Sequence, residues 1–115
     1  MIAAKTVSGA VLASDVRTAK TLWTRFWGLM GRSRLAQGEA LLIDPCYSVH
    51  TFFMRFPIDV LFLDGDNRVV KVAGDLKPYR FAVGRGARRV LEAAAGSAAR
   101  AGVRAGDQLE FQDSH

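Results

Sequence analysis

The six residues Ile58–Leu63 constrain the fold more than any other stretch of this chain. Successive side chains of a strand point to opposite faces, and here both alternate sets are mostly apolar. One set comprises Ile58, Val60 and Phe62, and the other contains Leu61 and Leu63. A strand that is apolar on both faces is normally central and covered on both sides. We therefore expect a sheet that carries a packed layer on each face of this strand.

Three ionisable residues interrupt the apolar run from position 50 to position 64, namely His50, Arg55 and Asp59. A buried carboxylate costs free energy unless a charge or hydrogen-bond donors compensate it, so Asp59 is the strongest indication of a site. Glu92 is a second acid in an apolar setting. These four residues are the candidate ligand-binding residues, and they could line one polar pocket. The alternative is a structural network in which an arginine pairs with Asp59.

The remaining pattern predicts a mainly β fold, a compact sandwich or barrel-like sheet of six or more short strands. Strands are expected at residues 10–13, 40–43, 58–63, 68–73, 79–83, 88–94 and 108–111. One substantial helix is expected at about residues 19–30, because large apolar residues recur there with a helical period and Thr18 could cap it. Ser97 is expected to cap a short helical turn that Gly102 ends.

Composition bounds the class of protein. A chain of 115 residues with 50% hydrophobic and 23% charged residues predicts one globular domain, residues 1–115. It contains no apolar run near the ~18 residues of a membrane span, and its first residues do not resemble a signal peptide. A single cysteine excludes an internal disulfide and is typical of a reducing compartment. We expect a soluble, cytoplasmic protein.

Cys46 and His50 are four positions apart, a spacing that supports neither a metal site nor a pair of nucleophile and base. As a metal site the pair lacks two of four ligands. As a nucleophile and base, the two need a contact that an extended segment does not give at this spacing. We expect no metal and no cofactor.

The positive charge is concentrated in one segment. Residues 68–91 contain seven Lys or Arg and one acid, a net charge of +6 (7 − 1), whereas the whole chain carries +5. The candidate basic patch comprises Lys77, Arg80, Arg85, Arg88 and Arg89. It could attract an acidic ligand or nucleic acid, or be a solvated face. Because Tyr79, Phe81 and Val83 share the face of a predicted strand that we expect in the core, nucleic acid is a disfavoured partner.

Several motifs together resemble one family. They are Phe-Trp-Gly-Leu-Met at 26–30, Phe-Met-Arg-Phe-Pro-Ile-Asp-Val-Leu-Phe at 53–62, Val-Leu-Glu at 90–92 with Gly96, and Gly106-Asp107. In this order they are similar to the domain-of-unknown-function 192 family of bacteria and archaea. The resemblance implies a compact, mainly β fold with a short helix packed on it, and no established activity. Many relatives carry an export signal, and many have Asn-Thr before Pro-Leu-Asp, where this chain has Arg55 and Phe56.

Three functions remain open on these observations. The first is a non-enzymatic module that binds a small ligand or a partner in a polar pocket near Asp59 and Glu92. The second is a small hydrolase or lyase that uses Asp59, Glu92 and His50 as acid and base. The third is nucleic-acid binding through the basic patch, for which we expect weak affinity that disappears at physiological salt.

Overall fold

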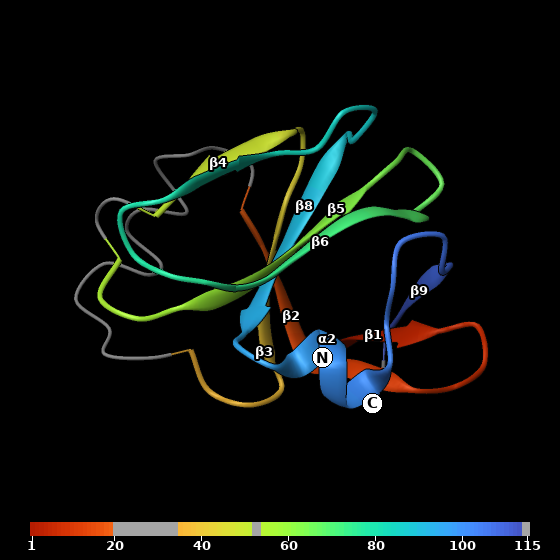
Figure 1. Cartoon of the computed structure of the whole chain (residues 1–115). Coiled ribbons are helices and arrows are strands. Elements are labelled where there is room, and N and C mark those ends of the chain that lie inside the picture. Colours follow the sequence, from red (N-terminus) through yellow and green to blue (C-terminus); the bar gives the residue numbers. More distant parts are fainter. Residues whose placement is uncertain (20–34, 52–53, 114–115) are drawn as a thin grey trace.

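The computed structural model describes residues 1–19, 35–51 and 54–113, which form nine strands and one short helix. The fold is mainly β, as the sequence predicts, and the large sheet curls into an open half-barrel (Figure 1). Within the described ranges no helix is long and apolar enough to cross a membrane.

Seven strands form the larger sheet, in the order β6-β5-β8-β3-β2-β1-β9. Neighbouring strands are antiparallel except β2 and β3, which pair in parallel. Parallel neighbours need a long crossover connection, and residues 20–38 lie between them in the chain. The bounds are β1 Ile2–Thr6, β2 Val11–Ala19, β3 Glu39–Ile43, β5 Ile58–Leu63, β6 Val69–Leu76, β8 Arg89–Ala94 and β9 Leu109–Asp113.

β5 confirms the expectation of a doubly covered strand. All six of its residues are buried, and β6 and β8 flank it. Leu61 and Leu63 pack on one face of the sheet with residues of β1, β2 and β9 and with the helix α2, Ser97–Ala101. Ile58, Val60 and Phe62 pack on the other face. Two hydrophobic cores therefore lie on opposite sides of one strand.

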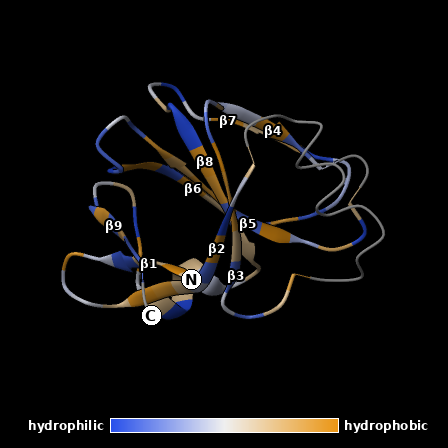
Figure 2. Ribbon diagram, turned by 180° about the vertical axis from the view of Figure 1, so that it is seen from behind, coloured by the Kyte–Doolittle hydropathy of each residue, from blue (hydrophilic) through white to orange (hydrophobic). Residues whose placement is uncertain are grey.

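A two-stranded ribbon covers part of the second core. It pairs β4, Ser48–His50, with β7, Phe81–Val83, in antiparallel register. Val49 and Ala82 are opposite each other in this register and are buried in the second core. Figures 1 and 2 both show the ribbon apart from the larger sheet, on the side away from α2.

Several predicted boundaries are wrong. The first expected strand, 10–13, is the start of β2, which continues to Ala19, so Thr18 lies in a strand. The rest of the expected helix at 19–30 lies outside the described residues. β1 was not predicted because two of its five residues are alanine, which has low strand propensity. β6 extends past residue 73 to Leu76, and β7 begins at Phe81 rather than at residue 79.

The short helix was placed correctly, but its cap was not. Ser97 is the first residue of α2, and Gly96 is the N-cap, in a left-handed conformation with φ 89°. Gly102 ends the helix, also left-handed, as expected. Since glycine has no side chain to accept a hydrogen bond, the acceptor for the first turn must come from elsewhere in the fold.

Candidate functional site

Asp59 supplies that acceptor from β5. Its side chain is buried, with 2% of the residue exposed, and its Oδ2 accepts the Ala98 N–H at 2.9 Å. Its Oδ1 accepts the N–H groups of Asp75 at 2.9 Å and Gly96 at 3.1 Å. One carboxylate thus binds β6 and the start of α2 to β5. The prediction that an arginine pairs with Asp59 is therefore wrong, because backbone N–H groups satisfy this carboxylate.

Asp59 and Glu92 lie on opposite faces of the sheet. In the β5–β8 register Asp59 is opposite Ala93, and Glu92 is opposite Val60. Ala93 belongs to the core beside α2, and Val60 to the core beneath the ribbon. Because paired residues of antiparallel strands share a face, these two buried acids point away from each other. An acid–base pair of Asp59 and Glu92 is therefore not assembled.

The other two candidate residues also lie elsewhere. His50 is the last residue of β4 and is half-buried opposite Phe81 in the ribbon. Arg55 is exposed in the segment before β5. The four polar residues predicted to line one pocket are thus placed on the ribbon, in a loop and on both faces of the sheet.

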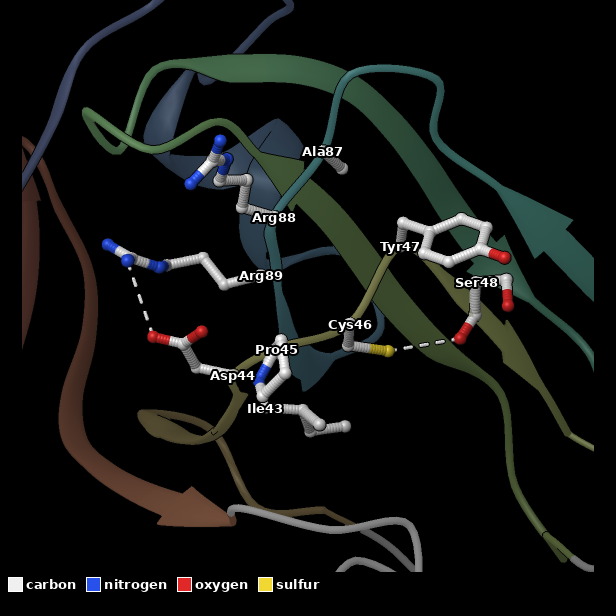
Figure 3. Close-up of a pocket in the computed structure, with 9 residues that line it drawn as sticks. All are labelled: Ile43, Asp44, Pro45, Cys46, Tyr47, Ser48, Ala87, Arg88 and Arg89. Atoms are coloured by element: carbon white, nitrogen blue, oxygen red, sulfur yellow. Dashed lines mark hydrogen bonds and ion pairs between the residues drawn. The ribbon is translucent and has the colours of Figure 1, made fainter.

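A different cleft lies where β3 ends and β8 begins. Its volume is about 580 Å³, within the usual range for small-ligand sites. The walls are two segments that follow and precede these strands, residues 43–48 and residues 87–89. Figure 3 shows the Arg88 and Arg89 side chains extending to the same side of the cleft as Asp44. Figure 2 shows β8 hydrophilic at its start and hydrophobic further along.

Arg89 is held in place by two side chains, but one of its three nitrogens has no partner among the described residues. One terminal nitrogen lies 3.3 Å from Oδ2 of Asp44, and the other donates to the Asn67 side-chain oxygen at 2.7 Å. Its Nε is buried and has no hydrogen-bond partner among the described residues. Buried donors without partners are rare in folded proteins and call for an explanation. Two guanidinium groups and one carboxylate line the cleft, which leaves one net positive charge (2 − 1).

Cys46 and Tyr47 form the opposite side of the cleft. The Cys46 thiol is half-buried and donates to the Ser48 carbonyl oxygen, with 3.0 Å between Sγ and O (Figure 3). Tyr47 is 63% exposed. In the part of the chain that the structure describes, no group of three or more His, Cys, Asp or Glu residues could hold a metal ion. This side of the cleft therefore offers an aromatic ring and one thiol.

The basic patch is exposed, but the aromatic residues within it are not where the sequence predicted them. Lys77, Arg80, Arg85 and Arg88 are exposed, and Arg89 is half-buried in its ion pair. Tyr79 is 72% exposed, Phe81 69% and Val83 38%, so the expectation that these three fill the core is wrong. Ala82 and Val49 occupy the buried face instead.

Sequence reasoning missed the cleft because its two walls are distant in the chain. The antiparallel pairing of β3 with β8, Ile43 opposite Val90, brings Asp44 beside Arg89. The sequence shows Arg88 and Arg89 side by side at the start of a predicted strand, but it does not show that Asp44 pairs with Arg89. A prediction that β3 pairs with β8 would have located the cleft, but no such pairing was predicted from the sequence.

Comparison with known proteins identifies relatives along most of the chain. The model of the DUF192 family, described as Uncharacterized ACR, matches residues 3–111. A UPF0127 protein of Pyrococcus furiosus is 37% identical over 107 residues, covering 90% of this chain and 91% of the relative. A UPF0127 protein of Thermococcus sibiricus is 32% identical over 112 residues, covering 90% and 70%.

Two solved structures have a similar fold. A putative transcription regulator from Sinorhizobium meliloti superposes with a TM-score of 0.80 at 28% identity, covering 96% of this chain and 91% of that one. A protein of unknown function from Novosphingobium aromaticivorans gives 0.76 at 29% identity, covering 95% and 82%.

Proposed function

The chain belongs to the DUF192 family, and from the geometry of its cleft we propose that it is a non-enzymatic module that binds a small anionic ligand. The ligand occupies the cleft between residues 43–48 and residues 87–89. The single observation that carries this proposal is the Arg88–Arg89 pair, whose two guanidinium groups line the cleft with the single carboxylate of Asp44.

The chemistry of the cleft favours a carboxylate or phosphate group. Arginine binds such groups through two parallel N–H donors, and hydrogen bonds between charged groups are about twice as strong as neutral ones. Arg88 is exposed and, within the described residues, forms no ion pair. Arg89 is already positioned by Asp44 and Asn67, which lowers the entropy that it loses on binding. The apolar residues Ile43, Pro45 and Ala87 also line the cleft and can contact the organic part of such a ligand.

Calorimetric titration with inorganic phosphate, pyrophosphate and citrate tests the proposal. We expect saturable binding of at least one probe and a loss of about tenfold or more in affinity for Arg88→Gln, since a charge-assisted hydrogen bond contributes about 1.5–3 kcal/mol. Arg104→Gln is the matched control, because Arg104 is also exposed but lies after α2, outside the residues that line the cleft. Equal effects of the two variants, or no heat with any probe, would contradict the proposal.

A further inference from the structure

The outer face of the ribbon is the most unusual surface that the structure describes. Phe81 and Val83 project from β7 on the face opposite to buried Ala82, and Tyr79 precedes them. Large apolar side chains are seldom this exposed in a group, and such groups commonly mark a binding surface. Tyr47, beside β4, lies close by, since its carbonyl accepts the Gly84 N–H at 2.9 Å.

Buried hydrogen bonds from Thr51 hold the backbone that carries these exposed aromatic residues. Thr51 is fully buried, and its Oγ1 donates to the Lys77 carbonyl at 2.6 Å and accepts the Arg80 N–H at 3.0 Å. Its backbone N–H donates to the Arg80 carbonyl at 2.8 Å. Tyr79 between them has φ 64°, a left-handed conformation that interrupts the extended chain. The aromatic side chains therefore sit on a backbone that is held at several points.

The sheet lies too close beneath the ribbon for the aromatic residues to turn inward. A Cβ at Gly84 would overlap the side chain of Phe62 in β5. The inward position of β7 is Ala82, which has only a methyl group and is buried. Because the space is filled, the exposure of Phe81 is a fixed feature of the fold.

The segment that carries these aromatic residues is strongly basic. Residues 76–89 contain five Lys or Arg and no acid. Lys77, Arg80 and Arg85 are exposed, and among the described residues none of the three forms an ion pair with a carboxylate. Their charges are available to an anionic partner, and they alternate along the chain with Tyr79 and Phe81.

We infer that the ribbon's outer face binds single-stranded nucleic acid, with bases stacked on Tyr79 and Phe81 and phosphates paired with Lys77, Arg80 and Arg85. Alternating aromatic and cationic side chains are what such a strand requires, since every base has a stacking face and every linkage a charge. The ground on which the sequence disfavoured this partner, burial of the aromatic residues, does not hold.

The positive charge of the segment and the short, partly occupied edge of β7 favour single-stranded nucleic acid over a peptide that would add a strand to the ribbon. A peptide that extended the ribbon at β7 would need free backbone groups along a strand edge. β7 has three residues, and the carbonyl of Val83 already accepts the Lys71 Nζ at 2.9 Å. A lysine at a strand edge is a common protection against strand addition.

Fluorescence anisotropy with labelled oligo(dT) of about 16 nucleotides tests the inference. At about 150 mM salt we expect a dissociation constant of about 1 µM or below, and weaker binding of a duplex, whose bases are already stacked. The Tyr79→Ala and Phe81→Ala variants should each lose about tenfold, the change that about 1.4 kcal/mol of stacking gives. Val11→Ala, an exposed apolar residue in β2, is the matched control.

A second set of variants separates stacking from charge. Arg80→Gln and Arg85→Gln should weaken binding and each reduce the salt slope by about 1, whereas Arg104→Gln should not. If charge variants weaken binding but the aromatic variants do not, the surface is an unspecific cationic patch and the inference is wrong. It is also wrong if phosphatidylserine vesicles or polyglutamate bind and the oligonucleotide does not. Cleft variants at Arg88 do not enter this test, so the proposed anion site can fail independently.

Discussion

Replacement of Asp59 by alanine should be strongly destabilising, for a reason that the structure specifies. The carboxylate accepts three backbone N–H bonds, from Asp75, Gly96 and Ala98. Alanine leaves all three donors without this acceptor. The Ala98 donor is buried, and an unsatisfied buried donor costs about 1–3 kcal/mol. The other two are partly buried and can recover some hydration, so about 1 kcal/mol each is reasonable.

The sum is roughly 3–5 kcal/mol, a large part of the about 5–15 kcal/mol that stabilises a domain of this size. Urea denaturation of Asp59→Ala and wild type measures it, through the shift in midpoint at constant slope. Asp113→Ala is the control, since the side chain of Asp113 is 71% exposed and, among the described residues, forms an ion pair with the N-terminus at 3.4 Å.

Asp59→Asn refines the test. An amide places one oxygen where the carboxylate has two, so its NH₂ group must face a backbone N–H on one side. We expect a smaller but clear loss, because at least one donor loses its acceptor. A change below about 1 kcal/mol for Asp59→Ala would refute the reasoning, because unsatisfied buried donors cost more than that.

Three further changes follow from individual contacts. Thr51→Val keeps the shape of the side chain but removes the hydrogen bonds to Lys77 and Arg80, at a cost of about 1–3 kcal/mol. The melting temperature should therefore fall, and the amides of residues 77 and 79–81 should exchange faster with deuterium. Gly84→Ala should cost about 1–3 kcal/mol by overlap with Phe62, whereas Gly65→Ala, where the nearest atom is 3.5 Å away, should cost less. The N–H groups of Arg68 and Asp66 hold the pKa of Asp64 below its ordinary value. Its contribution to stability is therefore present above the pKa of the unfolded chain and is lost as the pH falls through the lowered folded pKa; Asp64→Asn should remove part of this acid dependence in pH-resolved denaturation.

The sequence was sufficient to predict the mainly β architecture, because the alternation of apolar residues along a strand directly reflects which side chains are buried. The two-sided apolar pattern of Ile58–Leu63 could only be satisfied between two cores, and the structure has both. The course of β2 beyond Ala13 was harder to predict, because Ala13 and Val16 are both buried three positions apart, a spacing that the irregular β1–β2 pairing between them permits and simple alternation does not.

The site could not be predicted in the same way. The alternation of side chains along a strand assigns residues to two faces, but it does not say which face is buried in the core. Phe81 and Val83 do share a side of β7, but the buried side holds Ala82, since Phe62 fills the space beneath. Asp59 and Glu92 were each recognised as buried acids, and only the strand register places them on opposite faces. The cleft depends on the pairing of β3 with β8, which no local pattern encodes.

If the cleft between residues 43–48 and residues 87–89 binds a small anion, the backbone amides that line it should report the binding. Pyrophosphate is titrated into ¹⁵N-labelled protein, and the amide shifts are followed. We predict saturable shifts concentrated at residues 44, 46–48 and 87–89 and absent from α2, and their loss in Arg88→Gln. Shifts centred elsewhere, or the same shifts in Arg88→Gln as in wild type, would contradict the claim.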